Sequence, residues 1–231
     1  MKNAGGFSLV ELLATVAVTG VLATIVTSTA GKGLENADSA KCAAQLRQWG
    51  MALQSYVQDS GGSLPRRGQG VQPVSLVSRA EDWFNCLSPY LEMPPYNDLY
   101  LEGKAPKPGD RSVFVCPSAK VTNTFTHFIT YGMNMYLSRW DQAEPCRIVQ
   151  LPSPSTLAFM ADSPGGYAST VPSSGKYSVA ARHAGCANVV FVDGHVGTFA
   201  GGYLGCGSGD KTQPDVRWKT EIEGDTWKPN P

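Results

Sequence analysis

The sequence predicts an α+β fold, in which one long N-terminal helix packs on a small antiparallel β-sheet and extensive irregular loops join the elements. Three observations support this prediction. An apolar run opens the chain, an apolar stripe at helical spacing follows it, and segments typical of strands cluster towards the other end. The 25 glycines and 16 prolines among 231 residues favour many turns over an all-helical body.

The helix is expected to begin with the apolar run. Residues 7–30 read FSLVELLATVAVTGVLATIVTSTA, and Glu11 is the only ionisable side chain in that run. About 20 apolar residues in a helix cross the hydrocarbon layer of a bilayer, which is about 30 Å thick. We therefore expect residues 7–30 to form a transmembrane helix, and Lys2 favours a cytoplasmic N-terminus.

A cleaved secretory signal and a plain membrane anchor are two simpler interpretations of the same run. Ser28-Thr29-Ala30 would serve as a small-residue cleavage site, but the run is longer than the apolar region of most signal peptides. Glu11 argues against both interpretations, because a carboxylate inside a spanning helix costs about 2.5–3.5 kcal/mol and normally has a functional partner.

The helix is expected to continue as an amphipathic segment over residues 31–62. Apolar side chains repeat there at alternating spacings of four and three residues, which places them on one face of a helix. These residues are Cys42, Leu46, Trp49, Leu53 and Tyr56. We expect this stripe to pack against the sheet as part of the core rather than to bind a cofactor.

The sheet is expected from segments in the C-terminal half. Residues 156–161 read TLAFMA, which is typical of a buried strand. Residues 188–192 and 195–199 flank Asp193-Gly194, which predicts a hairpin whose type I′ turn has two residues of positive φ. In the middle region, residues 82–87 predict a short helix and residues 112–116 a short strand.

The charge pattern and the missing motifs exclude several classes of function. Lys and Arg number 19, Asp and Glu also number 19, and no basic cluster stands out, which argues against nucleic acid as a partner. The sequence contains neither a phosphate-binding loop ending in Gly-Lys-Ser/Thr nor a G-x-S-x-G elbow. We therefore expect no enzymatic activity, no catalytic residue and no cofactor.

The N-terminal segment GFSLVE, residues 6–11, resembles the cleavage signature of type IV prepilins and type II secretion pseudopilins. The resemblance implies a pilin-like fold, a leader of residues 1–6, cleavage after Gly6 by a prepilin peptidase and N-methylation of Phe7. It also implies that Glu11 pairs with the new α-ammonium of a neighbouring subunit. Such a pair would offset a buried charge and fix the axial stagger of the subunits.

The rest of the chain resembles a pseudopilin-like subfamily that ends in the motif H-x9-D-G. His183 is followed by nine residues and then by Asp193-Gly194, and FVCPSA, TYGMN and LPSPSTLAFMAD precede it in the subfamily's order. The resemblance implies an α+β body over residues 63–207. Residues 208–231 fall outside the resemblance, and we expect them to form a tail. We expect His183 to bond to the hairpin turn or to the Asp193 carboxylate, in a structural role.

The six cysteines allow 15 disulfide connectivities. The body should face an oxidising compartment, where cysteines more often pair, and we expect Cys186 and Cys206 to form one bridge. The alternative is a zinc set of His183, Cys186, His195 and Cys206, whose spacing is only loosely that of a zinc finger.

Some major pseudopilins bind calcium through a C-terminal loop, and the tail of this chain also carries carboxylates. They are Asp210, Asp215, Glu221, Glu223 and Asp225. Their spacing matches no calcium loop, so we expect a solvated tail and no metal site.

The resemblance implies a structural subunit of a type II secretion pseudopilus or type IV filament, held first in the inner membrane with its body outside the cytoplasm. Its expected partners are the prepilin peptidase, other pilin or pseudopilin subunits, an inner-membrane assembly platform and membrane lipid. The alternative is a membrane-anchored binding module for a glycan, protein or metal, which would use the N-terminus only for export.

Overall fold

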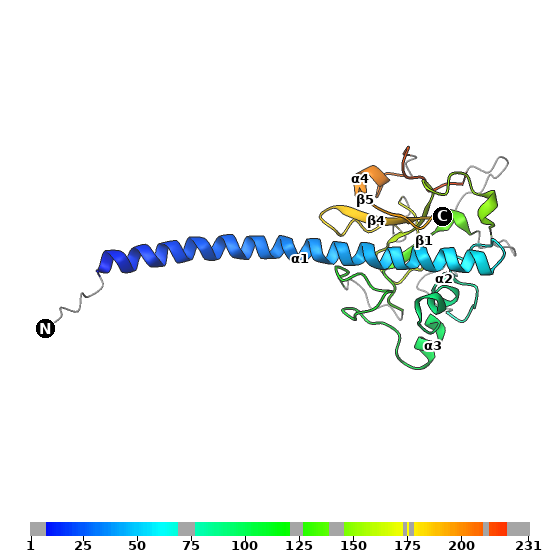
Figure 1. The fold of residues 1–231 in the computed structure, drawn as a ribbon, viewed down its shortest axis with the longest axis horizontal. Helices are drawn as coiled ribbons and strands as arrows, with labels where there is room; N and C mark the ends of the chain where they lie inside the picture. The colour runs from blue at the N-terminus through cyan, green and yellow to red at the C-terminus, as the bar shows by residue number, and fades with distance from the viewer. Residues whose placement is uncertain are drawn as a thin grey trace. The chain divides into compact units, whose positions relative to one another are not determined.

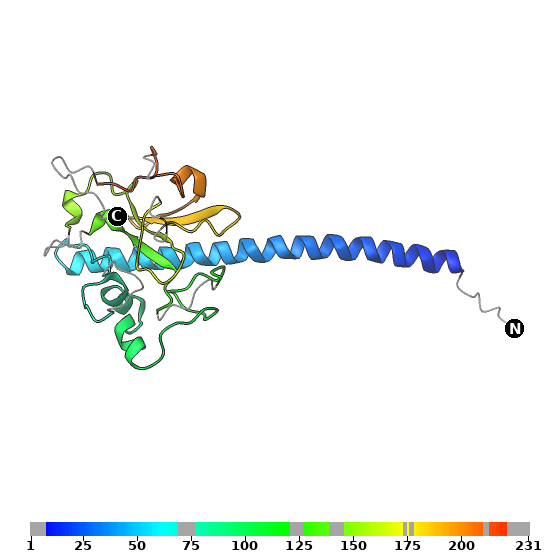
Figure 2. The same cartoon turned by 180° about the vertical axis from the view of Figure 1, so that it is seen from behind.

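The structure is a computed structural model that describes residues 8–68, 77–120, 127–138, 146–172, 175, 178–209 and 213–220, with the side chains of residues 25–32 left out. The chain divides into two compact units, Met1–Ala37 and Asp38–Pro231. Helix α1, Leu9–Asp59, contributes residues to both units (Figure 1, and seen from behind in Figure 2).

The described part of the first unit is helical, and its side chains are exposed. Eight large apolar side chains between Leu9 and Leu22 are 55% to 76% exposed. The threonines bond back to the helix: Thr15 Oγ1 donates to the carbonyl of Leu12 at 2.8 Å, and Thr24 Oγ1 to that of Val21 at 2.7 Å. These hydroxyl groups therefore need no partner outside the helix.

The predicted transmembrane segment, residues 7–30, is described only in part. Phe7 and the side chains of residues 25–30 lie outside the described residues. Across the part of the chain that is described, no helix combines the length and the apolar character that crossing a membrane requires.

The second unit contains a five-stranded sheet in the order β3-β1-β2-β4-β5. The strands are β1 Tyr131–Asn134, β2 Ala158–Asp162, β3 Ser169–Thr170, β4 Cys186–Phe191 and β5 Val196–Ala200. Three of the strand pairs are antiparallel, and the short β3 pairs with β1 in parallel. The predicted α+β fold is confirmed, with a mixed rather than a purely antiparallel sheet.

The amphipathic half of α1 supplies one face of the core. Cys42, Leu46, Trp49 and Leu53 are fully buried, as the spacing predicts. They belong to a core cluster that includes Met160 of β2 and Val190 of β4, whereas the adjacent Ala161 and Val189 belong to a second cluster. Since successive side chains of a strand point to opposite faces, the two clusters cover the two faces of the sheet.

The segment that covers the second face corrects the prediction of a solvated tail. Within residues 208–231, Val216 and Trp218 are buried in the second cluster. Their backbone adds to β2, because the amide of Ala158 donates to the carbonyl of Arg217 at 2.8 Å. Residues 213–220 are therefore part of the body, and residues 221–231 lie outside the described residues.

Short helices lie in the segments that connect α1 and the strands, and one follows β5. They are α2 Trp83–Cys86, η1 Ser88–Leu91, α3 Tyr96–Leu101, η2 Met135–Leu137, η3 Ile148–Gln150 and α4 Gly201–Leu204. The helix predicted over residues 82–87 is confirmed, with Asp82 at its N-cap position. The strand predicted over residues 112–116 is wrong: the amide of Val115 closes a turn on Ser112, and Phe114 is buried against Trp49, with ring centroids 5.2 Å apart.

The predicted β4–β5 hairpin is confirmed, but its turn differs from the prediction. Only Gly194 has positive φ, at 91°, whereas a type I′ turn would also require it of Asp193. The amide of Gly194 donates to the carbonyl of Phe191 at 2.9 Å, so the turn begins one residue earlier than predicted. The turn lies on α1, where Gln54 Nε2 donates to the carbonyl of Val192 at 2.6 Å.

Candidate functional site

The start of α1 carries the first candidate site. The amide of Ser8 donates to Glu11 Oε2 at 2.9 Å, and the amide of Val10 donates to Ser8 Oγ at 3.3 Å. These two contacts cap the start of the helix and satisfy two amides that the first helical turn leaves free. Gly6 and Phe7, the predicted processing residues, lie outside the described residues.

Glu11 lies among exposed apolar side chains in this first turn. Leu9, Val10, Leu12 and Leu13 surround it in the sequence, and all four are largely exposed. A contiguous apolar surface of this kind marks a site of contact with lipid or with another protein. The carboxylate is therefore placed where a covering helix or lipid would remove it from water.

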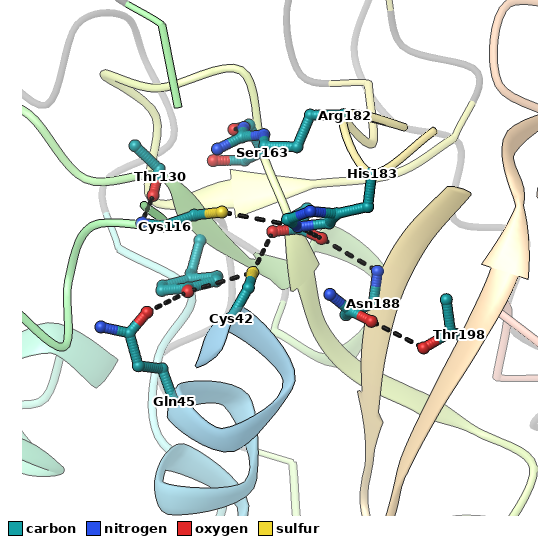
Figure 3. Close-up of polar contacts among 11 residues, drawn as sticks. Cys42, Gln45, Cys116, Thr130, Ser163, Arg182, His183, Asn188 and Thr198 are labelled. Atoms are coloured by element: carbon teal, nitrogen blue, oxygen red, sulfur yellow. Dashed lines mark hydrogen bonds and ion pairs between the residues drawn. The ribbon is translucent and has the colours of Figure 1, made fainter. Parts of the chain in front are cut away.

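A second candidate site is a buried cluster of four titratable side chains in the body (Figure 3). Cys42 comes from α1, Cys116 from the loop before β1, Asp162 from the end of β2 and His183 from the loop before β4. Their candidate ligand atoms all lie within 4.8 Å of one another. The four residues are 0% to 4% exposed, so their polar groups are almost fully withdrawn from water.

The contacts inside the cluster connect thiols, carboxylate and imidazole. Cys42 Sγ donates to Asp162 Oδ1 at 2.9 Å. His183 Nε2 lies 3.5 Å from Cys116 Sγ and 3.5 Å from Asp162 Oδ2. The other ring nitrogen, His183 Nδ1, has no hydrogen-bond partner among the described residues, so Nε2 alone orients the ring.

A ring of surrounding groups holds these side chains in place. The Tyr131 hydroxyl on β1 donates to Gln45 Oε1 at 2.7 Å, and the same hydroxyl oxygen of Tyr131 lies 3.2 Å from Cys42 Sγ. The amide of Asn188 on β4 donates to Asp162 Oδ2 at 2.9 Å. Both partners come from the sheet, so the cluster is tied to its rigid part.

The surroundings favour a positive charge on His183 and a negative charge on Cys116. Burial alone would lower the pKa of His183, but the hydrogen bonds and charges of Asp162 and Cys116 outweigh it and raise that pKa to about 9. The hydrogen bond from Cys42 lowers the pKa of Cys116 to about 5, against the opposing effect of burial. Burial, together with the bond to Cys116, raises the pKa of the Cys42 thiol.

A thiolate beside an imidazolium can act as a nucleophile, bind a metal ion or undergo oxidation. Nucleophilic catalysis requires that a substrate reach the sulfur. Cys116 is 1% exposed and His183 is 4% exposed, so this geometry suits an ion or a redox reaction between the sulfurs better than catalysis on an organic substrate.

The H-x9-D-G residues do not meet as predicted. The predicted partner of His183 is wrong, since its ring contacts Cys116 and Asp162. Asp193 instead lies 2.6 Å from His195 Nδ1 and accepts the His195 amide at 3.1 Å. Asp193 and Gly194 therefore shape the hairpin turn, while His183 belongs to the buried cluster.

The other predicted metal and disulfide residues are placed as follows. The alternative zinc set is not assembled, because His183 lies in the cluster and His195 stacks on Phe191, with ring centroids 4.2 Å apart. All six cysteines are described, and all six are free thiols in this structure. The expected bridge between Cys186 and Cys206 is therefore not formed here, and their pairing stays a prediction.

Among the tail carboxylates, Asp215 accepts a hydrogen bond from the Tyr203 hydroxyl at 2.6 Å. Asp210, Glu221, Glu223 and Asp225 lie outside the described residues.

Sequence reasoning missed three members of the cluster. Cys42 was interpreted as part of the apolar stripe, Cys116 as part of a short strand, and Asp162 as the end of an apolar segment. The available signal was a lone carboxylate directly after a buried strand, because a charged group at such a position needs a partner.

Comparison with known families bears on the first site. Residues 1–27 match the family model described as the prokaryotic N-terminal methylation motif. This match supports a type IV prepilin- or pseudopilin-like precursor. The motif implies processing by a prepilin peptidase, membrane anchoring and assembly with other pilin subunits. No curated protein and no solved structure matches the chain.

Proposed function

We propose that the chain is a structural subunit of a type II secretion pseudopilus or a related type IV filament. It is cleaved after Gly6, N-methylated at Phe7, held in the inner membrane through the start of α1 and then assembled, with no chemical turnover of its own. The observation that carries this proposal is the match of residues 1–27 to the methylation motif.

The exposed apolar surface of the first unit supports an assembly role. Its large side chains between Leu9 and Leu22 remain open to solvent in the single chain. Each fully buried Leu or Val gains about 1.5–3 kcal/mol over an exposed one, so covering this surface gives a strong drive to insert into lipid and then to bundle with other helices.

Glu11 fixes the axial alignment of neighbouring helices in the bundle. Cleavage creates an α-ammonium on Phe7, four residues before Glu11. In the precursor the carboxylate caps the helix through the Ser8 amide, and in the filament it pairs with the ammonium of a neighbouring subunit. A subunit that docks out of register leaves the carboxylate unpaired in apolar surroundings, which costs several kcal/mol.

The H-x9-D-G motif supports placing the body in the pseudopilin-like subfamily of that name. His183 lies at the buried cluster, and Asp193-Gly194 forms the turn that contacts α1. In this proposal the motif fastens the sheet to the helix and thus presents a rigid body on the filament.

Intact-mass analysis of the native protein tests the processing step. The mature chain should begin at Phe7 and carry one added methyl group. A mature chain that begins after Ala30 would contradict the proposal, because the cleavage would then remove Glu11 together with the whole apolar run.

Filament incorporation tests the assembly role. Glu11→Val should keep membrane insertion and cleavage but reduce incorporation to background, since the partner of the α-ammonium is lost. Thr15→Val is the matched control, because it places the same side chain one turn further along and leaves Glu11 in place. Wild-type incorporation of Glu11→Val would refute the assembly role and favour an anchored binding module.

A further inference from the structure

We propose that Cys42, Cys116, Asp162 and His183 form a buried site for one divalent transition-metal ion, with zinc as the ion that fits best. The site lies entirely in the body, and the inference does not depend on the proposed filament role.

The spacing of the four ligand atoms suits tetrahedral coordination. Bonds of about 2.0–2.3 Å from zinc to sulfur, nitrogen and oxygen place tetrahedral ligands about 3.3–3.8 Å apart. His183 Nε2 lies 3.5 Å from Cys116 Sγ, within that range. Cys42 Sγ lies 2.9 Å from Asp162 Oδ1, and no pair exceeds 4.8 Å, so shifts of well under 1 Å at most contacts bring all four atoms onto one ion.

The donor types select the class of metal. Two sulfurs, one imidazole nitrogen and one carboxylate oxygen form a set that suits zinc, whereas calcium and magnesium prefer sites made of oxygen atoms. With both thiols ionised, His183 neutral and Asp162 ionised, the ligands carry three negative charges, and a divalent cation offsets two of them. An ion therefore reduces the cost of burying these groups together.

The residues around the cluster already support the ligands. The Tyr131 hydroxyl lies 3.2 Å from Cys42 Sγ, where it can donate to a thiolate. The amide of Asn188 fixes one oxygen of Asp162 at 2.9 Å and leaves the other directed at the sulfur of Cys42. Groups of this kind orient metal ligands and tune their affinity.

A Cys42–Cys116 disulfide is the competing use of the same residues. The disulfide would use both sulfur atoms. Asp162 would lose the hydrogen bond that it accepts from the Cys42 thiol, and His183 would lose its contact with the Cys116 thiol. Among the described residues, the buried carboxylate and the buried imidazole would then keep only each other and the Asn188 amide as side-chain partners. Because all four side chains converge on one point, the metal accounts for more of the geometry than the disulfide does.

Cobalt binding to the full chain provides the test. The reduced, metal-free protein is titrated with Co²⁺, followed by Zn²⁺. We expect one Co²⁺ per chain, with the visible absorption of a tetrahedral ion and a thiolate-to-cobalt charge-transfer band, and displacement by one Zn²⁺. This measurement needs no variant, so it decides the question even if ligand substitutions unfold the body.

Variants then locate the ion. Cys116→Ser should abolish the charge-transfer band or weaken it at least several-fold, whereas Cys206→Ser removes a thiol outside the cluster and should leave the spectrum unchanged. His183→Gln and His195→Gln form a second matched pair with the same expected contrast. Tyr131→Phe should weaken metal affinity about tenfold to a hundredfold while all four ligands remain.

Three results would overturn the proposal. The first is the absence of stoichiometric Co²⁺ binding by the reduced chain. The second is a spectrum that Cys116→Ser leaves intact. The third is a Cys42–Cys116 cystine in peptide mapping of the native protein under non-reducing conditions, which would assign the cluster to a disulfide.

Discussion

Gly50 provides the sharpest test of how the hairpin packs on α1. An alanine Cβ at this position would lie 2.8 Å from the carbonyl oxygen of Gly194 and 2.8 Å from Cγ2 of Val190. In an exposed helix the same substitution stabilises, because glycine costs about 1 kcal/mol relative to alanine. Here the added methyl group must displace the backbone of the turn.

The two effects of Gly50→Ala have opposite signs. Overpacking in a filled core costs about 1–3 kcal/mol, and relief of the glycine penalty returns about 1 kcal/mol. The expected net loss in the free energy of unfolding is about 1 kcal/mol, and it reaches about 2 if the turn cannot shift. For a chain of this size, 1 kcal/mol corresponds to a decrease of about 2–4 °C in Tm.

Thermal denaturation of the full chain, followed by near-UV circular dichroism, measures this change. The Trp49 and Trp83 rings, with centroids 5.1 Å apart, report on packing beside the substituted Gly50. Gly202→Ala is the control, because a Cβ there has no atom within 4 Å. If Gly50→Ala proves at least as stable as Gly202→Ala, the close packing of the turn on α1 is refuted.

Three further substitutions have expected outcomes that the same denaturation assay checks. Trp218→Ala should lower the free energy of unfolding by about 3–5 kcal/mol, because the ring is buried on the second face of the sheet; a loss below about 1 kcal/mol would return this segment to a solvated tail. Gln54→Ala should cost about 0.5–1.5 kcal/mol through the lost bond to the carbonyl of Val192, and no loss would mean that the bond contributes nothing. Gly194→Ala should destabilise by about 1 kcal/mol or more, since φ is 91° there, and an unchanged Tm would contradict the strain.

The parts of the fold that were predicted correctly are those with a periodic signal. The spacing of the stripe from Cys42 to Leu53 fixes the buried face of the helix whatever covers it. The hairpin around Gly194 was also found, because strand residues flank a turn dipeptide. Its turn type was missed, since the two candidate turns use the same Asp-Gly pair and differ by one residue in register.

The elements that failed depend on distant partners. Residues 112–116 look like a strand locally, but no strand adds to the sheet there, and Phe114 is buried beside Trp49 instead. The buried segment around Trp218 has the composition of a loop, and its burial depends on the second face of the sheet, where Met135, Val171 and Leu204 are buried in the same cluster.

The buried cluster shows the same limit more strongly. Its members are separated by up to 141 positions, from Cys42 to His183, and no local pattern connects them. The H-x9-D-G spacing drew attention to His183 and Asp193 together, although the fold sends one into the core and leaves the other at the exposed hairpin turn. Only the pairing of β2 with β4 brings Asp162 and His183 into contact.

The apolar stripe of α1 is synthesised well before the strands that pack on it. The stripe on α1 is complete when Tyr56 leaves the ribosome, but the strands that cover it are finished only at Ala200. At about 5–20 residues per second, these roughly 140 residues take about 7–30 s to translate. During that interval Trp83 and Phe114, which pack on Trp49, are already made, but the sheet that covers the rest of the stripe is incomplete. That face of the helix therefore stays open to non-native contacts until the last strand is made.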